Sequence, residues 1–224
     1  MKSITIWILL LFMVITGCKT YTSYDKALRE AEDVEKLVLS RKKIGVLPAD
    51  IARLANLKEL RLFKSNLHKL PPEIGQLKKL KRLSLHHNSL KSLPREIGDL
   101  ESLEVLNLRY NKLKELPQEI TRLKNLKFLY LSWNQLSYLP EGIENLVNLQ
   151  TLDLERNNLK QLPMELGYLP NLVSLNIARA GSGLEIPVRL CKSRALEYLT
   201  IGRGNLLPTC FAVAGNRQLQ IIVR

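Results

Sequence analysis

The sequence has few of the residues on which catalysis and metal binding depend. It contains three histidines and three cysteines, and aromatic residues make up 6% of its 224 positions. The motifs of the nucleophile elbow, the glycine-rich phosphate loop and the CxxC pair are absent. His86 and His87 are neighbours, and adjacent strand residues point to opposite sides, so we expect them to share no metal ion. These absences argue against an enzyme, a cofactor and a metal site.

The N-terminal apolar stretch is short. It covers residues 4–15, only 12 positions, and a stretch of that length does not span a bilayer. Lys2 precedes it, and small residues follow it before Cys18. This order is typical of an export signal, so we expect residues 1–17 to be a signal peptide. An uncleaved anchor is the alternative.

The four residues Ile15-Thr16-Gly17-Cys18 resemble the lipobox of bacterial lipoproteins. The resemblance implies that cleavage leaves Cys18 as the first residue, with lipid on its sulfur and residues 18–23 as a lipidated tether. Because Lys19, not an acidic residue, follows the cysteine, the resemblance favours export to the outer membrane or cell surface of a bacterium with two membranes. An ordinary signal peptide with a chance cysteine is the alternative.

Cys191 and Cys210 are the only other cysteines. Export would place them in an oxidising compartment, where disulfides form and persist. They fall on segments that should be neighbours in the fold, but sequence alone does not supply the geometry that a disulfide demands. A disulfide and two buried free thiols both stay open.

A repeat with a period of 23 residues dominates the rest of the chain. Its clearest copy is LKRLSLHHNSLKSLPREIGDLES, from Leu80 to Ser102. The pattern LxxLxLxxNxL followed by xxLPxxIxxL resembles the 23-residue class of leucine-rich repeats found in many bacterial proteins. The eight copies begin at Val34, Leu57, Leu80, Leu103, Leu126, Leu149, Leu172 and Leu196.

The resemblance implies an α/β solenoid, a curved horseshoe with a concave parallel sheet and short helical or irregular convex segments. Within one copy, Leu83 and Leu85 alternate with exposed residues as a short strand requires. One repeat has too little apolar surface to fold alone, so stacking must join the leucines into one core. The asparagines of the pattern satisfy backbone groups at a tight turn and are scaffold, not site; they are Asn88, Asn111, Asn134 and Asn157.

The repeat pattern weakens at both ends. A cap residue followed by an apolar stripe predicts an N-terminal capping helix over residues 24–33, which leaves residues 34–224 as the repeat domain. The segment 180–183 carries one additional residue, so a local irregularity is expected there. A partial ninth repeat beginning at Leu219 supplies an edge strand, Leu219–Val223, whose apolar side chains favour edge-to-edge pairing.

The residues that should project from the concave face are the third, fifth and seventh of each repeat, and the eighth residues follow along one rim. Arginine and aromatic side chains, which dominate interface energetics, concentrate at these positions in repeats two to five. The alternative is that the rings favour strands and merely cover one another. The predicted ligand-binding patch is Phe63, His86, Arg109, Tyr110, Phe128, Tyr130, Trp133 and Arg156.

The net charge of +13 predicts a long-range attraction to anionic molecules. Nucleic acid is disfavoured as a partner because the basic residues are scattered through every repeat and no nucleic-acid-binding motif accompanies them. We expect a monomeric, non-enzymatic module that binds a protein partner, including one from a host, on the concave face of repeats two to five. The alternative is an envelope or adhesion component that holds polyanionic glycan or lipid through distributed charge.

Overall fold

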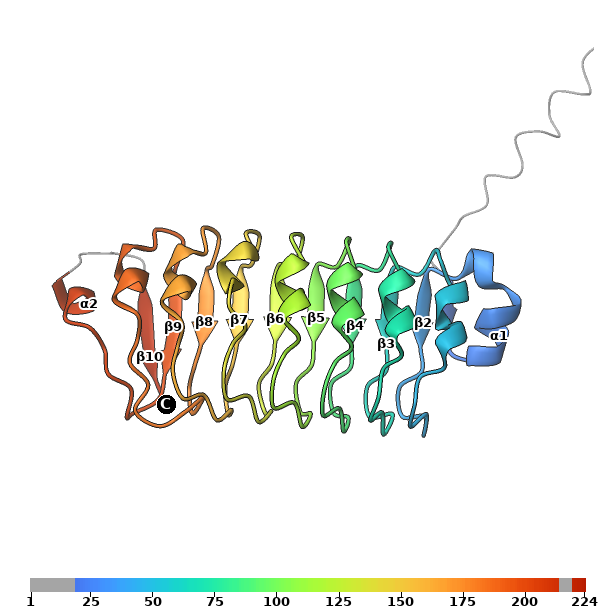
Figure 1. The fold of residues 1–224 in the computed structure, drawn as a ribbon, viewed down its shortest axis with the longest axis horizontal. Coiled ribbons are helices and arrows are strands. Elements are labelled where there is room, and N and C mark those ends of the chain that lie inside the picture. Colours follow the sequence, from blue (N-terminus) through green and yellow to red (C-terminus); the bar gives the residue numbers. More distant parts are fainter. Residues whose placement is uncertain (1–18, 214–218) are drawn as a thin grey trace, which may run out of the picture.

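The chain forms one sheet of ten parallel strands whose order in space is their order in sequence. The computed structural model describes residues 19–213 and 219–224, so Cys18 and the predicted signal peptide lie outside the described residues. Figure 1 shows the strands in an open row that is not curled into a closed arc. The predicted solenoid is confirmed. Its strands are β1 (Thr20–Tyr21), β2 (Lys36–Val38), β3 (Glu59–Arg61), β4 (Arg82–Ser84), β5 (Val105–Asn107), β6 (Phe128–Tyr130), β7 (Thr151–Asp153), β8 (Ser174–Asn176), β9 (Tyr198–Ile201) and β10 (Gln220–Val223).

Neighbouring strands from β2 to β8 pair with a constant offset of 23 residues. Leu60 lies opposite Leu83, and Leu83 lies opposite Leu106. Between β8 and β9 the offset becomes 24, because Leu175 lies opposite Leu199. The structure therefore has the additional residue where the sequence places it.

The last strand departs from the predicted register. In β10, Ile221 lies opposite Leu199, an offset of 22, whereas a repeat beginning at Leu219 would place Ile222 there. Three consecutive apolar residues carry no alternation, and alternation is what specifies the register of a strand. Ile222 and Val223, in this edge strand, are 38% and 58% exposed.

The N-terminal edge of the sheet is covered by a strand that the sequence pattern does not predict. β1 pairs with β2, and Tyr21 lies opposite Leu37 and is buried like it. The two residues carry no part of the repeat pattern, which is why they were expected to be tether. The segment 18–23 thus contains a strand of the sheet.

The segment expected to be a helix, residues 24–33, contains α1 (Tyr24–Arg29) and the 3-10 turn η1 (Ala31–Asp33). The Ser23 hydroxyl accepts a hydrogen bond from the backbone N–H of Lys26, the usual arrangement at a helix start. Figure 1 shows α1 at the N-terminal end of the row of strands.

Short 3-10 helices form a layer opposite the sheet. Six of the seven begin directly after a proline, whose fixed φ suits a helix start. Its missing N–H breaks no hydrogen bond of the sheet, because the proline lies beyond the strand. In the described residues, 19–213 and 219–224, no helix is long and apolar enough to cross a bilayer. The layer is η2 (Ala49–Arg53), η3 (Pro72–Gln76), η4 (Arg95–Asp99), η5 (Gln118–Arg122), η6 (Ile143–Asn145), η7 (Met164–Tyr168) and η8 (Val188–Lys192), followed by α2 (Cys210–Val213).

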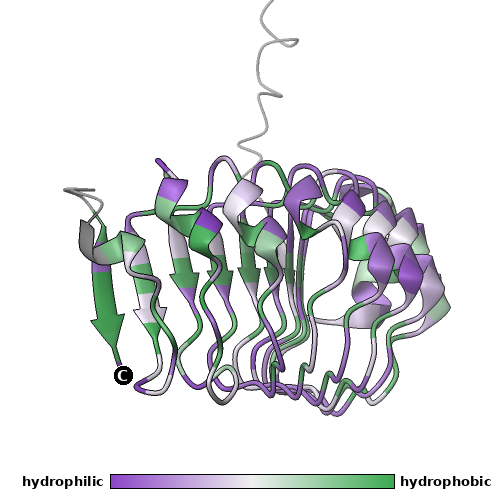
Figure 2. Ribbon diagram, turned by 60° about the vertical axis from the view of Figure 1, so that its left-hand side comes forward, coloured by the Kyte–Doolittle hydropathy of each residue, from purple (hydrophilic) through white to green (hydrophobic). Residues whose placement is uncertain are grey.

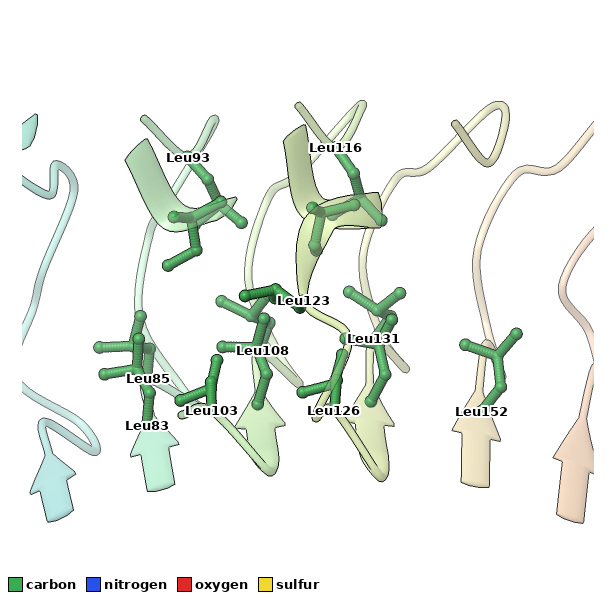
Figure 3. Packing of buried hydrophobic residues seen from close by; sticks show 14 of the residues in the cluster. Leu83, Leu85, Leu93, Leu103, Leu108, Leu116, Leu123, Leu126, Leu131 and Leu152 are labelled. Carbon is green, nitrogen blue, oxygen red and sulfur yellow. The ribbon is translucent and has the colours of Figure 1, made fainter. Parts of the chain in front are cut away.

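The space between the sheet and the 3-10 helices holds one continuous apolar core. Leu83 and Leu85 enter it from the strand side and Ile97 from the helix side, all fully buried. Figure 3 shows equivalent leucines of successive repeats beside one another, and Figure 2 shows hydrophobic and hydrophilic stretches alternating along each coil. The helices approach at backbone contact, because a Cβ on Gly98 would overlap the carbonyl oxygen of Glu119.

The predicted asparagine ladder joins consecutive repeats through buried hydrogen bonds. Asn134 donates to the carbonyls of Leu108 and Leu131 at 3.0 and 2.9 Å and accepts from the N–H of Leu113 at 3.1 Å. Asn88, Asn111 and Asn157 make equivalent bonds. The interpretation of these residues as scaffold is confirmed.

A second asparagine series, not predicted, lies at the last position of several repeats. Each side chain donates to a carbonyl 24 residues earlier, as Asn148 does to Lys124 at 2.8 Å. These turns are exposed, so water competes for the same bonds. The series comprises Asn56, Asn125, Asn148 and Asn171.

Cys191 and Cys210 are joined by a disulfide, with their Cα atoms 6.1 Å apart. Cys191 belongs to η8 and Cys210 begins α2. The bond therefore ties α2 to the preceding 3-10 helix. Of the two alternatives that the sequence left open, a disulfide and two free thiols, the structure has the disulfide.

Asn134→Ala should lower the free energy of unfolding by about 2–4 kcal/mol, because one N–H and two carbonyls lose their partner in a buried turn. Urea denaturation measures the change. Asn148→Ala is the matched control, since it removes a single bond from an exposed turn and should cost less than about 1 kcal/mol. Equal losses in the two variants would contradict the structural role of the buried ladder.

Candidate functional site

The solvent-facing side of the sheet is formed by the third, fifth and seventh residues of the repeats. In β6, Leu129 is fully buried while Phe128 and Tyr130 on either side of it stay partly exposed. Equivalent residues of neighbouring strands lie about 4.8 Å apart. We call this surface the sheet face.

The eighth residue of each of the first seven repeats has a left-handed backbone. In seven successive repeats its φ lies between 52° and 62°, a conformation that glycine or asparagine adopts at the lowest cost. Simple alternation would point this side chain into the core, and the left-handed turn directs it outward instead. Every one of the seven is nevertheless cationic or aromatic: Arg41, Lys64, His87, Tyr110, Trp133, Arg156 and Arg179.

Four of these residues form a continuous stack along the rim, which we call the rim ladder: His87, Tyr110, Trp133 and Arg156. The His87 and Tyr110 rings are stacked with centroids 4.1 Å apart, and the Tyr110 and Trp133 rings follow at 5.1 Å. The Arg156 guanidinium lies 4.0 Å from the Trp133 ring centroid, within cation–π range. Tyr110 and Trp133 are still 39% and 40% exposed.

Phe63 and His86 connect to the N-terminal end of the rim ladder. Their rings are stacked with centroids 4.6 Å apart, and the His86 ring lies 5.6 Å from that of His87. Two cations, Arg41 and Lys64, lie 5.6 and 5.5 Å from the Phe63 ring centroid. The aromatic surface therefore ends in cations on both sides.

A second cluster lies on the sheet face around Arg109. Its guanidinium covers the Tyr130 ring at 4.1 Å and donates from Nε and Nη2 to one oxygen of Asp153, at 3.0 and 2.6 Å. Asp153 is only 6% exposed and also accepts from Asn176. Phe128 stacks on Tyr130 at 6.4 Å. Asp153 is thus buried and held from two sides, by Arg109 and by Asn176.

The eight residues of the predicted patch therefore fall into two groups. Phe63, His86, Tyr110, Trp133 and Arg156 belong to the stack along the rim, and Arg109, Phe128 and Tyr130 form the sheet-face cluster. The argument that His86 and His87 must point apart is wrong, because β4 ends at Ser84 and His87 has a φ of 55°. No cluster of three or more metal-ligating side chains occurs in the described residues.

A cluster of charges surrounds Glu59 and was not predicted from the sequence. This carboxylate is 7% exposed and forms ion pairs with Lys36 and Arg82, both at 3.5 Å, and with Arg61. Burial alone would raise the pKa of Glu59, but the three surrounding cations hold that pKa below its ordinary value. The signal was present in the sequence as three basic residues at outward positions of adjacent repeats.

An exposed apolar groove at the C-terminal end was also missed. Met164, Val188, Leu206 and Leu207 line it and are 40–60% exposed. The repeat pattern places the first two on the convex segments, where it makes no prediction about exposure.

Comparisons with known proteins agree with this architecture. A family profile described as a leucine-rich repeat region matches residues 120–205, and a second described as leucine-rich repeat matches residues 55–113 and 78–136. No curated protein matches the sequence.

Three solved structures illustrate the similarity. A leucine-rich-repeat protein of Leptospira interrogans is 35% identical with a TM-score of 0.75; the alignment covers 92% of this chain and 58% of that one. The ectodomain of the Arabidopsis thaliana receptor kinase GASSHO1/SCHENGEN3, in complex with CASPARIAN STRIP INTEGRITY FACTOR 2, is 27% identical with a TM-score of 0.71. That alignment covers 85% of this chain and 27% of the receptor chain. The plant peptide hormone receptor RGFR1, in complex with RGF2, is 30% identical with a TM-score of 0.67, covering 85% and 36%. This chain thus spans less than two thirds of each.

Acidification should destabilise the fold through His86. Burial lowers the pKa of His86, and the positive charges of His87 and Arg109 lower it further. Because the unfolded-state pKa is near the ordinary value of about 6.5, the unfolded chain takes up the proton first as pH falls. The contribution of His86 to the stability of the fold is complete above about pH 7. It is lost as pH falls through about 6.5 towards the folded-state pKa of His86.

Urea denaturation at several pH values between 7.5 and 5.0 measures this loss. His86→Gln should lose less stability over that range than the wild type, and the control His68→Gln should lose as much as the wild type. A His86→Gln chain that declines as steeply as the wild type would contradict the assignment.

Proposed function

This chain belongs to the leucine-rich-repeat family, and on that premise we propose that it is a non-enzymatic module that binds a protein partner on its sheet face and rim. The family fold is commonly used for protein binding, and the structures of two similar plant receptors were determined in complex with a ligand. The partner surface is centred on repeats two to five.

The rim ladder is the observation that carries this proposal. Tyrosine, tryptophan and arginine are enriched at interface hot spots, and here they are exposed in one line. Each ring is held by its neighbours, so a partner immobilises few additional rotamers on binding. Keeping these side chains at left-handed positions costs about 1–2 kcal/mol per residue, a cost that glycine would avoid.

A second candidate function is binding of polyanionic glycan or lipid. The net charge of +13 favours it, because cations spread over a surface attract any dense polyanion. Such binding should weaken steeply with salt, whereas binding through the rim ladder should tolerate salt.

We further propose that the chain is exported and anchored by lipid on Cys18 at the outer membrane or cell surface of a bacterium. The order of residues around Cys18 supports this proposal. Because Thr20 already belongs to β1, only Lys19 would separate the lipidated residue from the sheet, a reach of about 7 Å. The N-terminal edge of the sheet would lie next to the membrane.

A Tyr130→Ala/Trp133→Ala variant should capture fewer partner proteins than the wild type. Both proteins are immobilised, incubated with envelope or host extract, and compared by quantitative mass spectrometry, at low and at high salt. We expect at least one protein to be retained by the wild type at both salt concentrations and reduced about tenfold or more on the variant, as hot-spot losses of about 1.4 kcal/mol or more imply.

The matched control is Tyr138→Ala/Tyr168→Ala, which removes two aromatic side chains of 47% and 50% exposure away from the rim ladder. It should capture the same proteins as the wild type. A captured set that is unchanged in both variants, or reduced equally in both, would contradict the proposed surface.

The lipid anchor has its own test. Cells that express the wild type in the presence of a labelled fatty acid should label the chain, and Cys18→Ala should abolish the label. Cys191→Ala is the control and should leave the label in place. Equal labelling of the wild type and Cys18→Ala would rule out the anchor.

A further inference from the structure

The outward positions of the repeats are unusually basic. The third, fifth, seventh and eighth residues of repeats one to seven are 28 positions, of which eight are cationic and three acidic. In the whole chain the corresponding numbers are 34 and 21, so the excess of cations is concentrated on this surface. The cations are Lys36, Arg41, Arg61, Lys64, Arg82, Arg109, Arg156 and Arg179, and the acids are Glu59, Asp153 and Glu155.

The two ends of this surface differ in how far their charges are neutralised. At the C-terminal end, Arg109 is paired with Asp153 at 2.6 Å and Arg156 with Glu155 at 3.9 Å. At the N-terminal end, the single carboxylate of Glu59 pairs with three cations, on β2, β3 and β4. Over repeats one to three, five cations against one acid give a surplus of +4, whereas over repeats four to seven three cations against two acids give +1, from Arg179.

Two rim cations are part of the larger surplus. Arg41 and Lys64 lie over the Phe63 ring, and no carboxylate among residues 19–213 and 219–224 forms an ion pair with either of them. We call the five residues Lys36, Arg41, Arg61, Lys64 and Arg82 the basic cluster. With Glu59 it carries a net charge of +4.

Glu59 holds part of this cluster in place without neutralising it. Its carboxylate is 7% exposed, whereas the side chains of Arg61 and Arg82 are 51% and 56% exposed. The guanidinium groups are thus oriented at the sheet while most of their surface faces solvent. Arginines that are already ordered lose little conformational entropy when they bind a carboxylate.

The aromatic surface next to the basic cluster favours a polypeptide over a sugar polymer. In the rim ladder the ring faces are covered by neighbouring rings and by Arg156, so few faces are open for a sugar ring to stack on. Repeats four to six also offer no surplus cation, because Arg109 and Arg156 are paired. A polyanion of uniform charge would match only one half of the surface.

We propose that the basic cluster binds an acidic stretch of an extended polypeptide, and that the adjoining rim ladder binds apolar or aromatic side chains of the same segment. This proposal rests on the proposed function and specifies its partner. From β2 to β6 the surface spans four strand spacings, about 19 Å, which an extended segment covers with about six residues. Its acidic residues would lie over β2 to β4 and its apolar residues over β5 and β6.

The test uses defined polymers as probes with the purified full chain. The first probe is a random copolymer of glutamate and tyrosine in a 4:1 ratio, the second is polyglutamate, and the third is heparin. Dissociation constants are measured by biolayer interferometry at about 150 mM salt. We expect the copolymer to bind more tightly than polyglutamate and heparin, because it alone offers groups to both halves of the surface.

The decisive variant is Arg61→Glu/Arg82→Glu, and its matched control is Arg95→Glu/Arg122→Glu on η4 and η5, which changes the net charge by the same amount. The first should weaken copolymer binding at least tenfold, and the control should weaken it less than twofold. Arg61→Gln/Arg82→Gln avoids placing an acidic residue beside Glu59 and should show an intermediate loss, which covers the case in which the first variant fails to fold.

Three results would overturn the proposal: no binding of the copolymer, tighter binding of heparin than of the copolymer, or equal losses in the cluster and control variants. Tyr130→Ala/Trp133→Ala in the same assay distinguishes a failure of the acidic partner from a failure of the aromatic binding surface. If that variant loses copolymer binding while the cluster variant keeps it, the acidic partner is wrong and the aromatic surface stands. If neither variant loses binding, both fail.

Discussion

The structure depends on the contact between equivalent residues of successive repeats. A single repeat cannot bury its leucines, and they are buried only because the next repeat presents the same residues at the same height. The asparagine ladder has the same requirement, since each amide bonds to the backbone of its own repeat and of the one before it. Backbone contact at Gly98 leaves no room for a shifted register.

The register that aligns the core also aligns the surface. Because the eighth residues of the first seven repeats share the same left-handed φ, their side chains project in parallel at the spacing of the repeats. Planar groups at that spacing stack, and His87, Tyr110 and Trp133 do so. A rigid exposed surface thus arises from one position of the repeat, and its character at each point is set by a single residue. The division into a basic and an aromatic part follows from which residues occupy that position and the adjacent strand positions.

The core and the ladder could be predicted because they repeat. The positions of Leu83 and Leu85 and the role of Asn134 follow from the period of 23, and the 24-residue offset at β9 is visible in the sequence as one departure from that period. The N-terminal strand could not, because a two-residue strand with Tyr21 as its only buried residue has no periodicity.

The site could be predicted only in part, because the alternation of inward and outward residues along a strand does not specify backbone turns or side-chain contacts. The sequence located the aromatic residues and the rim, but the rule that neighbours point apart fails where the backbone turns left-handed, as it does at His87. The burial of Glu59 and Asp153 depends on neighbours from other repeats. Pairwise contacts such as those of Arg109 with Tyr130 and Asp153 come from side-chain conformations, which a repeat pattern does not specify.

Photocrosslinking tests whether a partner binds along the rim and sheet face. A benzoyl-phenylalanine is placed at Tyr110 in one version of the chain and at Tyr168 in another. Tyr110 lies in the rim ladder, and Tyr168 is an exposed tyrosine at the end of η7. We expect a crosslinked partner from position 110 and none from position 168. Crosslinking from position 168 alone, or equally from both, would contradict it.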